Sequence, residues 1–360
     1  MSWIGLRDHR DGQFRPGGLD ADTPLTPAED GVLARGSVQL ECSYVRGTGA
    51  ITLLHYDTEV PWPVRFTLFF DASGTLHLGH RVGSHGTWLR LDPGLSSPTD
   101  GIIITYAWDA PERRAWLSLY HPESDLFCHA DLQGPMPLCL RDVRRMSSLD
   151  SGVSLGGSVE WLGLADHIAP MGPVPGLSGG ARVKMSNGTP RRIDRVAVGD
   201  RLATVCGAGA IVRWIGSAAL IARGRWAPLR LRAPYHDLQR DMEVSKHQRL
   251  LIAGSNVEYL FGVEEVSAAA GHLADRRSVL PAPTRPVVRY WQVVLDRPAT
   301  LIAEGCAVES LDPGPILDDP SARPLTVLAN LPSSLLPQRA ATVPVLQGFE
   351  AMTLAHAGAA

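Results

Sequence analysis

Short runs in which apolar and polar residues alternate fill the first part of the chain. Residues 37–44 read Ser-Val-Gln-Leu-Glu-Cys-Ser-Tyr, and residues 64–70 read Val-Arg-Phe-Thr-Leu-Phe-Phe. An alternation with a period of two puts every second side chain on one face of a strand, so each run predicts a strand with one buried face. We identify no helical pattern between these runs. They therefore predict an antiparallel β-sandwich of the jelly-roll kind at residues 31–160.

Turn residues between the runs support antiparallel pairing. Asp109-Ala-Pro-Glu-Arg-Arg114 separates residues 101–108 from residues 115–120, and this combination of strand pattern and turn residues predicts a hairpin. The order of strands and turns resembles that of concanavalin-like and laminin-G-like jelly rolls. Residues 141–145, which follow these strands, are predicted to form a short terminal strand.

Three tryptophans in this region are candidates for carbohydrate binding, which sandwiches of the resembled kinds often perform by stacking an aromatic ring on a sugar. They are Trp62, Trp88 and Trp108, with Asp109 as a polar partner. Trp62 lies between two prolines, so a rigid loop could present its ring. The alternative is that the rings are buried, because tryptophan contributes a large area to a core. We assign Trp108 to the core and leave both interpretations open for Trp62 and Trp88.

Three histidines that lie close together in the sequence suggest a metal hypothesis. His77 and His80 are three residues apart on one predicted strand, so they point to opposite faces and cannot chelate one ion without a bulge. Together with His85 they are better explained as scattered surface histidines. We predict no metal site and no cofactor.

A stretch rich in proline precedes the second set of β-type runs. Pro170, Pro173 and Pro175 stiffen the end of the segment 161–175, which we interpret as a linker. Further along, Asn187-Gly188 is a hairpin turn signal. Residues 263–273 carry the one good helical pattern of this part and predict a short helix.

Four segments of the second half occur in a recognisable order. They are Gly176-Leu-Ser-Gly-Gly-Ala-Arg-Val183, Val198-Gly-Asp-Arg-Leu202, Val212-Arg-Trp-Ile-Gly216 and Val244-Ser-Lys-His-Gln-Arg-Leu-Leu251. In this order they resemble the Hint module of hedgehog and intein proteins, and above all the bacterial Hint-domain proteins. The resemblance implies a β-rich domain that acts on the peptide bond just before its first residue.

The family chemistry needs two residues that this chain lacks. The first residue of an active module is a cysteine or serine that attacks the preceding carbonyl, and a histidine in a later Ser-x-x-His element protonates the scissile amide. Here the nucleophile position is Gly176, the serine is Ser245 and the histidine position is Gln248. Glycine has no side chain, and glutamine cannot transfer a proton at neutral pH. The resemblance therefore implies a Hint fold whose self-cleavage is disabled.

Displaced residues could supply this chemistry only in a rearranged site. Ser178 lies two residues inside the module, and His247 lies one residue early, which on a strand is the opposite face unless a bulge restores it. Cys206 is a further candidate nucleophile. The rival interpretation is thus a self-cleaving Hint protein with a rearranged nucleophile. The module ends in Glu309-Ser-Leu-Asp312, without the His-Asn pair of an intein, and Gly176→Cys with Gln248→His is the restoration test.

Composition narrows the class of the protein. Hydrophobic residues make up 44% and charged residues 20% of the 360 residues, as in ordinary globular proteins, and a net charge of −3 argues against a nucleic-acid partner. The five scattered cysteines, with no Cys-x-x-Cys pair, favour free thiols in a reducing compartment. The N-terminus has no apolar core of signal-peptide length, and we identify no membrane span. The default location is cytoplasmic, with export by a non-classical route as the alternative.

These observations predict a mainly-β protein in five parts. They are an extended lead-in at 1–30, a lectin-like sandwich at 31–160, the linker at 161–175, a Hint-like domain at 176–315 and a tail at 316–360 that docks on the Hint-like domain. We expect a binding or structural protein whose sandwich recognises a glycan or protein ligand. The sequence does not indicate the oligomeric state.

Overall fold

The computed structural model describes residues 1–20, 31–149, 152–311, 320–336 and 343–358. It confirms a mainly-β protein, and the chain divides into two compact units. The N-terminal unit comprises Met1–Gly172 with Arg223–Arg225, and the C-terminal unit comprises Pro173–Ala222 with Trp226–Ala360. Parts of the predicted lead-in, Hint-like domain and tail lie outside the described residues, at 21–30, 312–319, 337–342 and 359–360.

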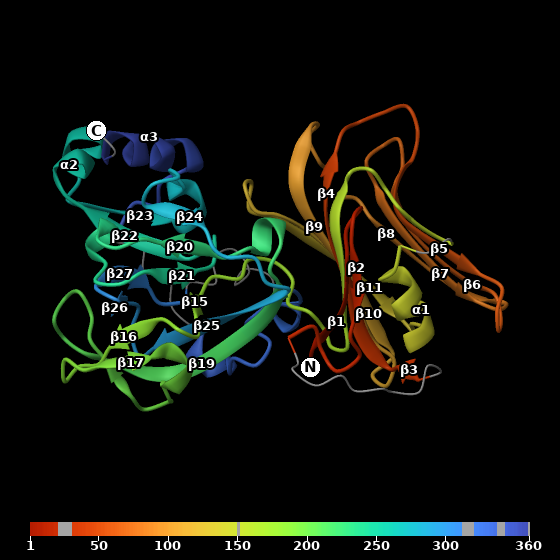
Figure 1. Ribbon diagram of the computed structural model, residues 1–360, viewed down its shortest axis with the longest axis horizontal. Coiled ribbons are helices and arrows are strands. Elements are labelled where there is room, and N and C mark those ends of the chain that lie inside the picture. The colour runs from red at the N-terminus through yellow and green to blue at the C-terminus, as the bar shows by residue number, and fades with distance from the viewer. Residues whose placement is uncertain (21–30, 150–151, 312–319, 337–342, 359–360) are drawn as a thin grey trace. The chain divides into compact units, whose positions relative to one another are not determined.

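One face of the N-terminal unit is a seven-stranded antiparallel sheet with the strand order β11-β10-β9-β4-β14-β1-β2 (Figure 1). The predicted hairpin is present, because Asp109 pairs with Arg114 at the turn between β9 and β10. The strands are β1 (Trp3–Arg7), β2 (Gly12–Phe14), β4 (Arg35–Tyr44), β9 (Thr99–Asp109), β10 (Arg114–His121), β11 (Leu126–Gln133) and β14 (Val159–Ala165).

A five-stranded antiparallel sheet, β13-β5-β6-β7-β8, forms the second layer and confirms the predicted sandwich. Apolar side chains of both sheets share one core, in which the rings of Phe66 and Tyr106 have their centres 5.9 Å apart. The remaining elements of the unit are β5 (Ile51–Thr58), β6 (Val64–Phe70), β7 (Leu76–Val82), β8 (His85–Leu91), β13 (Val153–Leu155), the pair β3 (Val32–Leu33) and β12 (Leu138–Cys139), and helix α1 (Leu140–Met146).

Two segments of this unit differ from the sequence expectation. The predicted lead-in contains β1, which lies between β14 and β2 and is buried along its whole length. Residues 141–145 belong to α1 and not to a terminal strand. The reason is tertiary packing, because Val143 and Met146 lie three residues apart, share one helix face and are both fully buried in the core.

The C-terminal unit consists of two antiparallel sheets around a second core. The first has the order β18-β19-β25-β15-β21-β20-β24, and the second has the order β17-β16-β26-β27-β22-β23. The strands of the first are β15 (Leu177–Ser178), β18 (Arg201–Leu202), β19 (Ala210–Ile221), β20 (Leu229–Leu231), β21 (Met242–Val244), β24 (Val279–Pro281) and β25 (Val287–Leu295). Those of the second are β16 (Arg182–Lys184), β17 (Pro190–Arg192), β22 (Arg249–Ala253), β23 (Glu265–Ala269), β26 (Thr300–Ala303) and β27 (Cys306–Glu309).

Helices are a minor part of the described chain: besides α1 they are α2 (Ser255–Phe261), α3 (Gly348–Gly358) and a few 3-10 turns. The predicted helix at residues 263–273 is wrong. Its central residues form β23, because pairing with β22 buries Val266 and Ala268, and Ala270–Leu273 is a 3-10 turn. Within the described residues, no helix is long and apolar enough to cross a membrane.

The tail folds back onto the C-terminal unit. Strand β23 lies at the edge of its sheet, and Val345 forms a parallel bridge with Ser267 of this strand. The Ser267 amide donates to the Pro344 carbonyl, and the Leu346 amide donates to the Ser267 carbonyl, both at 2.8 Å. Leu346 is buried in the core of the unit, and Figure 1 shows α3 lying beside α2. The tail thus covers a sheet edge and contributes to the core.

Candidate functional site

The peptide bond between Pro175 and Gly176 lies at the start of β15, a two-residue strand inserted between two neighbours. Leu177 pairs with Val244 of β21 on one side and with Trp291 of β25 on the other. Because a strand in the middle of a sheet is held from both sides, the backbone just before it is held with little freedom. This is the bond that the Hint resemblance singles out.

Three successive carbonyls around this bond accept hydrogen bonds from two residues. The Ser245 hydroxyl donates to the Val174 carbonyl at 2.5 Å, and the Ser245 amide donates to the Gly176 carbonyl at 2.9 Å. The Gln292 side-chain amide donates to the Pro175 carbonyl at 2.8 Å. Ser245 and Gln292 are 2% and 4% exposed, so these bonds are shielded from water. We name this arrangement the carbonyl clamp.

Gly176 leaves no room for a side chain at the nucleophile position. Its φ of 151° is a backbone conformation that residues with a side chain rarely adopt. A Cβ atom there would lie 2.8 Å from the Trp291 carbonyl oxygen and 3.1 Å from Nε2 of Gln292. The strand β25 therefore occupies the space into which a nucleophilic side chain would project.

Gln248 uses its side chain to link the backbones of β22 and β27. Its side-chain amide donates to the carbonyls of Arg249 and Glu309, both at 3.0 Å, and the residue is 5% exposed. Both donor hydrogens of the amide are therefore used by backbone acceptors. A cavity of only about 10 Å³ remains between Gln248 and the carbonyl clamp, and its lining includes Pro175, Gln248 and Gln292. That volume holds about one water molecule.

The displaced candidates Ser178 and His247 lie in different surroundings. His247 uses its backbone amide to donate to the Ser245 hydroxyl at 3.1 Å, while its ring lies 5.4 Å from the ring of Trp226. Ser178 is in β15 opposite Tyr290, on the far side of Leu177 from the bond. Ser178 and His247 thus have different neighbours, Tyr290 for the first and Trp226 for the second.

Cys206 is exposed and comes after β18. It lies two residues after Thr204, which forms an isolated antiparallel bridge with Leu301 of β26. The Thr204 hydroxyl, with its oxygen 3.1 Å from the Cys206 sulfur, lowers the pKa of this thiol, and the Ala208 backbone and Arg297 add to the effect. The thiolate of Cys206 is therefore favoured.

The tryptophans of the sandwich lie in three different environments. Trp108 is fully buried, and its indole N–H donates to the Leu33 carbonyl at 2.8 Å. Asp109, the last residue of β9, is 6% exposed and pairs with Arg35 of β4 at 2.8 Å. Trp62 is 48% exposed and Trp88 is 68% exposed.

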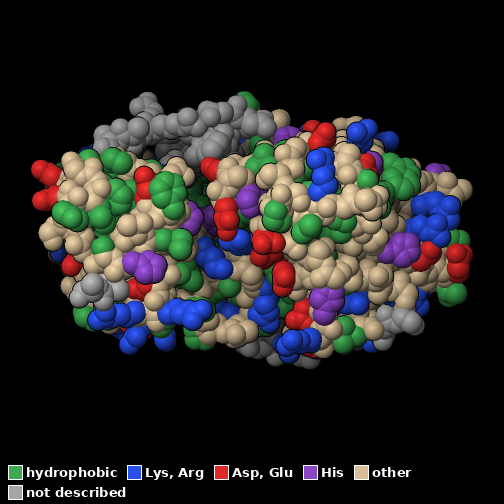
Figure 2. Space-filling model, turned by 90° about the horizontal axis from the view of Figure 1, so that it is seen from above, with side chains coloured by type: hydrophobic (Ala, Val, Ile, Leu, Met, Phe, Trp, Pro, Cys, Tyr) green, Lys and Arg blue, Asp and Glu red, His purple; other side chains and the backbone are tan. Residues whose placement is uncertain are grey.

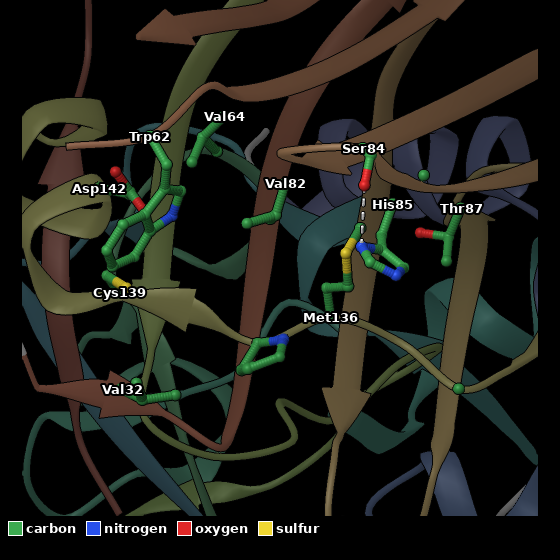
Figure 3. A pocket seen from close by; sticks show the side chains of 13 residues that line it. Val32, Trp62, Val64, Val82, Ser84, His85, Thr87, Met136, Cys139 and Asp142 are labelled. Atoms are coloured by element: carbon green, nitrogen blue, oxygen red, sulfur yellow. Dashed lines mark hydrogen bonds between the residues drawn. The ribbon is translucent and has the colours of Figure 1, made fainter. Parts of the chain in front are cut away.

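Trp62 lines a cleft of about 700 Å³ in the N-terminal unit. Figure 3 shows Trp62 and Asp142 on one side, and Ser84, His85 and Thr87 on the other. The walls between them are apolar and are formed by side chains such as Val32, Val64, Val82 and Met136. The cleft therefore combines a half-exposed aromatic ring with a few polar groups, the usual composition of a small-molecule site.

Asp142 is the polar group of this cleft that the sequence analysis missed. It is 6% exposed, and Oδ1 accepts a hydrogen bond of 2.6 Å from the Tyr56 hydroxyl. Burial and this bond raise the pKa of Tyr56. Because residues 141–145 read as a strand, nothing in the sequence placed Asp142 on a helix facing Trp62.

The three histidines of the metal hypothesis are spread over the sheet. His77 points outward and pairs with Asp71 at 2.8 Å, His80 points into the core and is 1% exposed, and His85 is exposed at the start of β8. The interpretation of all three as surface residues is therefore wrong for His80. Across the described residues there is no cluster of three or more His, Cys, Asp or Glu that could hold a metal.

Comparison with known proteins supports the resemblance of the C-terminal unit to the Hint module. Residues 175–315 match the family model of the Hint domain. No curated protein matches the chain. Among solved structures, a carbohydrate-binding module (CBM40) of the Ruminococcus gnavus IT-sialidase is 13% identical, with a TM-score of 0.28, over 37% of this chain and 77% of that one. A DnaB intein from Synechocystis sp. PCC 6803 is 10% identical, with a TM-score of 0.27, over 39% of this chain and all of that one. The gp41-1 intein is 10% identical, with a TM-score of 0.25, over 38% of this chain and 98% of that one.

Proposed function

We propose that this protein, whose residues 175–315 form a Hint domain, is a binding protein that does not cut itself and whose sandwich binds a glycan. The observation that carries the first part is the occupied carbonyl clamp. The bond that an active Hint domain would break is held in place, and the residue at the nucleophile position is a glycine. The domain in this proposal serves as a rigid support for the segment that links it to the sandwich.

Loss of both catalytic positions supports the absence of cleavage. A nucleophile and its base act as a unit, so losing either one removes most of the rate, and this chain has Gly176 and Gln248 in the two places. The rival function requires Ser178, Cys206 or His247 to approach the Pro175 carbonyl. Misplacement of about 1 Å already costs on the order of a hundredfold in rate. The positions of these residues in the sheet therefore favour the inactive form.

The purified protein is expected to remain intact at 38.8 kDa during prolonged incubation, with or without dithiothreitol or hydroxylamine. Intact-mass spectrometry over several days measures this directly. The variants Ser178→Ala, His247→Ala and Cys206→Ser should behave as the unchanged protein does. A fragment that begins at or near Gly176 and disappears in one of these variants would establish the rearranged site instead.

The cleft at Trp62 supports the second part of the proposal. A sugar ring has an apolar face that packs against an aromatic ring, and hydroxyl groups that hydrogen-bond to polar side chains. Trp62 offers the ring, and Asp142, Ser84 and Thr87 offer carboxylate and hydroxyl groups within the same cleft. The cleft is also large enough for a ligand of one or two sugar units, since small-molecule pockets have volumes of about 300–1,000 Å³.

Replacement of Trp62 by alanine should weaken the binding of neutral oligosaccharides at least about tenfold, since a tenfold change corresponds to about 1.4 kcal/mol and an aromatic contact supplies about this much. A glycan array followed by titration calorimetry on the best ligand measures the change. Tyr259→Ala is the matched control, because Tyr259 is an exposed aromatic residue of α2 and does not line the cleft. Equal affinities of the Trp62→Ala variant and the unchanged protein would remove the cleft from the proposal.

A further inference from the structure

The outer face of the five-stranded sheet presents Trp88 in an unusual setting. Gly79 of β7 pairs directly with Trp88 of β8, and a Cβ atom at Gly79 would lie 2.7 Å from the indole ring. The absence of a side chain at position 79 allows the ring to lie against the neighbouring strand. With 68% of its surface exposed, the indole keeps its other side open to solvent. The sheet thus carries a flat aromatic platform.

Two arginines lie on either side of this platform. Arg81 is two residues beyond Gly79 on β7, and Arg90 is two residues beyond Trp88 on β8, opposite His77. Residues two apart on a strand point the same way, so the side chains of Trp88, Arg81 and Arg90 share the outer face. Arg81 and Arg90 are exposed. The pairing register separates them by four residues along the strands, which is about 14 Å.

The charge of this face is positive. Arg65 is neutralised by Asp57 at 2.6 Å, and Asp71 is occupied by His77 at 2.8 Å. By contrast, no carboxylate of the described residues lies within ion-pair distance of Arg81 or Arg90. In Figure 1, β5, β6, β7 and β8 lie together in one of the two layers of their unit. The two guanidinium groups are therefore available to an anionic ligand that lies across the strands.

We propose that this face binds an acidic polysaccharide, with one sugar ring stacked on Trp88 and its anionic groups held by Arg81 and Arg90. Guanidinium groups bind carboxylates and sulfates through paired hydrogen bonds, and an indole accepts the apolar face of a sugar. Because about 14 Å separates the arginines, a single sugar cannot reach both. The ligand must be an oligomer or polymer with charges on more than one unit. This site is separate from the cleft at Trp62 and stands independently of it.

A single-stranded nucleic acid would need a different surface. Such ligands bind along a basic groove in which several aromatic side chains stack successive bases. This face offers one exposed tryptophan and two free arginines, and the protein carries a net charge of −3. Figure 2 shows basic and acidic side chains scattered over the visible surfaces. The observations favour the polysaccharide.

The test compares three probes against the full chain: a hexagalacturonate, the neutral maltohexaose and an oligothymidylate. We expect binding of the hexagalacturonate, measured by titration calorimetry, to weaken with added salt, and to fall at least about tenfold in Trp88→Ala and in the double variant Arg81→Ala/Arg90→Ala. Trp88→Tyr should restore most of the affinity, because it restores an aromatic platform. Trp62→Ala should bind the hexagalacturonate as tightly as the unchanged protein.

The matched control is Arg10→Ala/Arg113→Ala, which removes two exposed arginines from turns of the other sheet. If this pair weakens binding as much as the Arg81/Arg90 pair, attraction is only general and the proposal is overturned. The same holds if maltohexaose binds equally well, if the oligothymidylate binds more tightly through Trp88, or if no binding is seen at about 1 mM probe. Loss caused by Trp62→Ala but not by Trp88→Ala would assign acidic glycans to the cleft instead.

Discussion

Replacing Gly176 with cysteine is expected to leave the protein uncut and to destabilise its C-terminal unit by several kcal/mol. The backbone at Gly176 has a φ of 151°, and strained conformations of this kind cost about 1–3 kcal/mol for a residue with a side chain. The new Cβ would lie 2.8 Å from the Trp291 carbonyl oxygen, so β25 would have to shift as well. Forced shifts in a packed interior cost about 1–3 kcal/mol more.

Adding Gln248→His to this variant should not rescue the reaction. Gln248 donates two hydrogen bonds to the carbonyls of Arg249 and Glu309, and an imidazole in its place could serve only one of them. The acceptor that loses its partner is partly buried, and leaving a buried acceptor unpaired costs about 1–3 kcal/mol. We therefore expect the restoration test, Gly176→Cys with Gln248→His, not to recover cleavage, because both replacements disturb the pairing of the strands.

Urea unfolding and intact mass after incubation with dithiothreitol measure both parts of this expectation. Gly180→Cys is the matched control, because Gly180 is exposed and no atom lies within 4 Å of where its Cβ would be. We expect the control to unfold at the urea concentration of the unchanged protein. A Gly176→Cys variant that is equally stable and releases a fragment after Pro175 would show that the clamp accommodates a nucleophile.

Acidification should destabilise the N-terminal unit through His80. This side chain is 1% exposed, and its ring faces that of Phe66 with centres 5.5 Å apart. Neither ring nitrogen has a hydrogen-bond partner among the residues that the structure describes. Burial lowers the pKa of His80 from 6.5 to about 4. The unfolded chain therefore takes up a proton as the pH falls below 6.5, whereas the folded chain stays neutral at this site until about pH 4.

The contribution of His80 to stability is complete above pH 6.5 and is lost as the pH falls from 6.5 to 4. A pKa difference of this size corresponds to on the order of 3 kcal/mol between the two limits. Unfolding in urea at pH 7 and at pH 4.5 should show this loss, and His80→Leu should remove most of it. His85→Ala is the control, because that histidine is exposed. An unchanged pH dependence in His80→Leu would contradict the assignment.

The alternation of residues was sufficient to predict the strands of the sandwich because its two faces differ in burial. In β6, Val64, Phe66, Leu68 and Phe70 are buried while Arg65 is exposed, as a period of two requires. Residues 263–273 could not be predicted in this way. Their alanines suit a helix by propensity, but β22 and the tail impose a strand on part of the segment.

In the candidate sites, too, the residues that follow a motif could be predicted, whereas those placed by tertiary packing could not. Gly176, Ser245 and Gln248 were identifiable because their spacing follows a motif, but Gln292 was not. It reaches the Pro175 carbonyl only because β15 inserts beside β25, and that pairing joins residues more than a hundred positions apart. Asp142 was likewise hidden, since its place in the cleft depends on α1. The exposure of Trp62 and Trp88 was also decided by packing, which no local pattern encodes.

The tail that pairs with β23 has a consequence for synthesis of the protein. Domains fold as units when the ribosome releases them, and N-terminal ones come first. The sandwich can close once β14 has emerged, because β14 supplies the partner of β1. The core of the C-terminal unit includes Leu346 and Leu354, which are synthesised long after the strands they pack against. This core is therefore incomplete until the tail has been synthesised. Until then β23 is an edge strand with its outer side unpaired, and a chaperone or a neighbouring nascent chain can bind to it before the protein's own tail does.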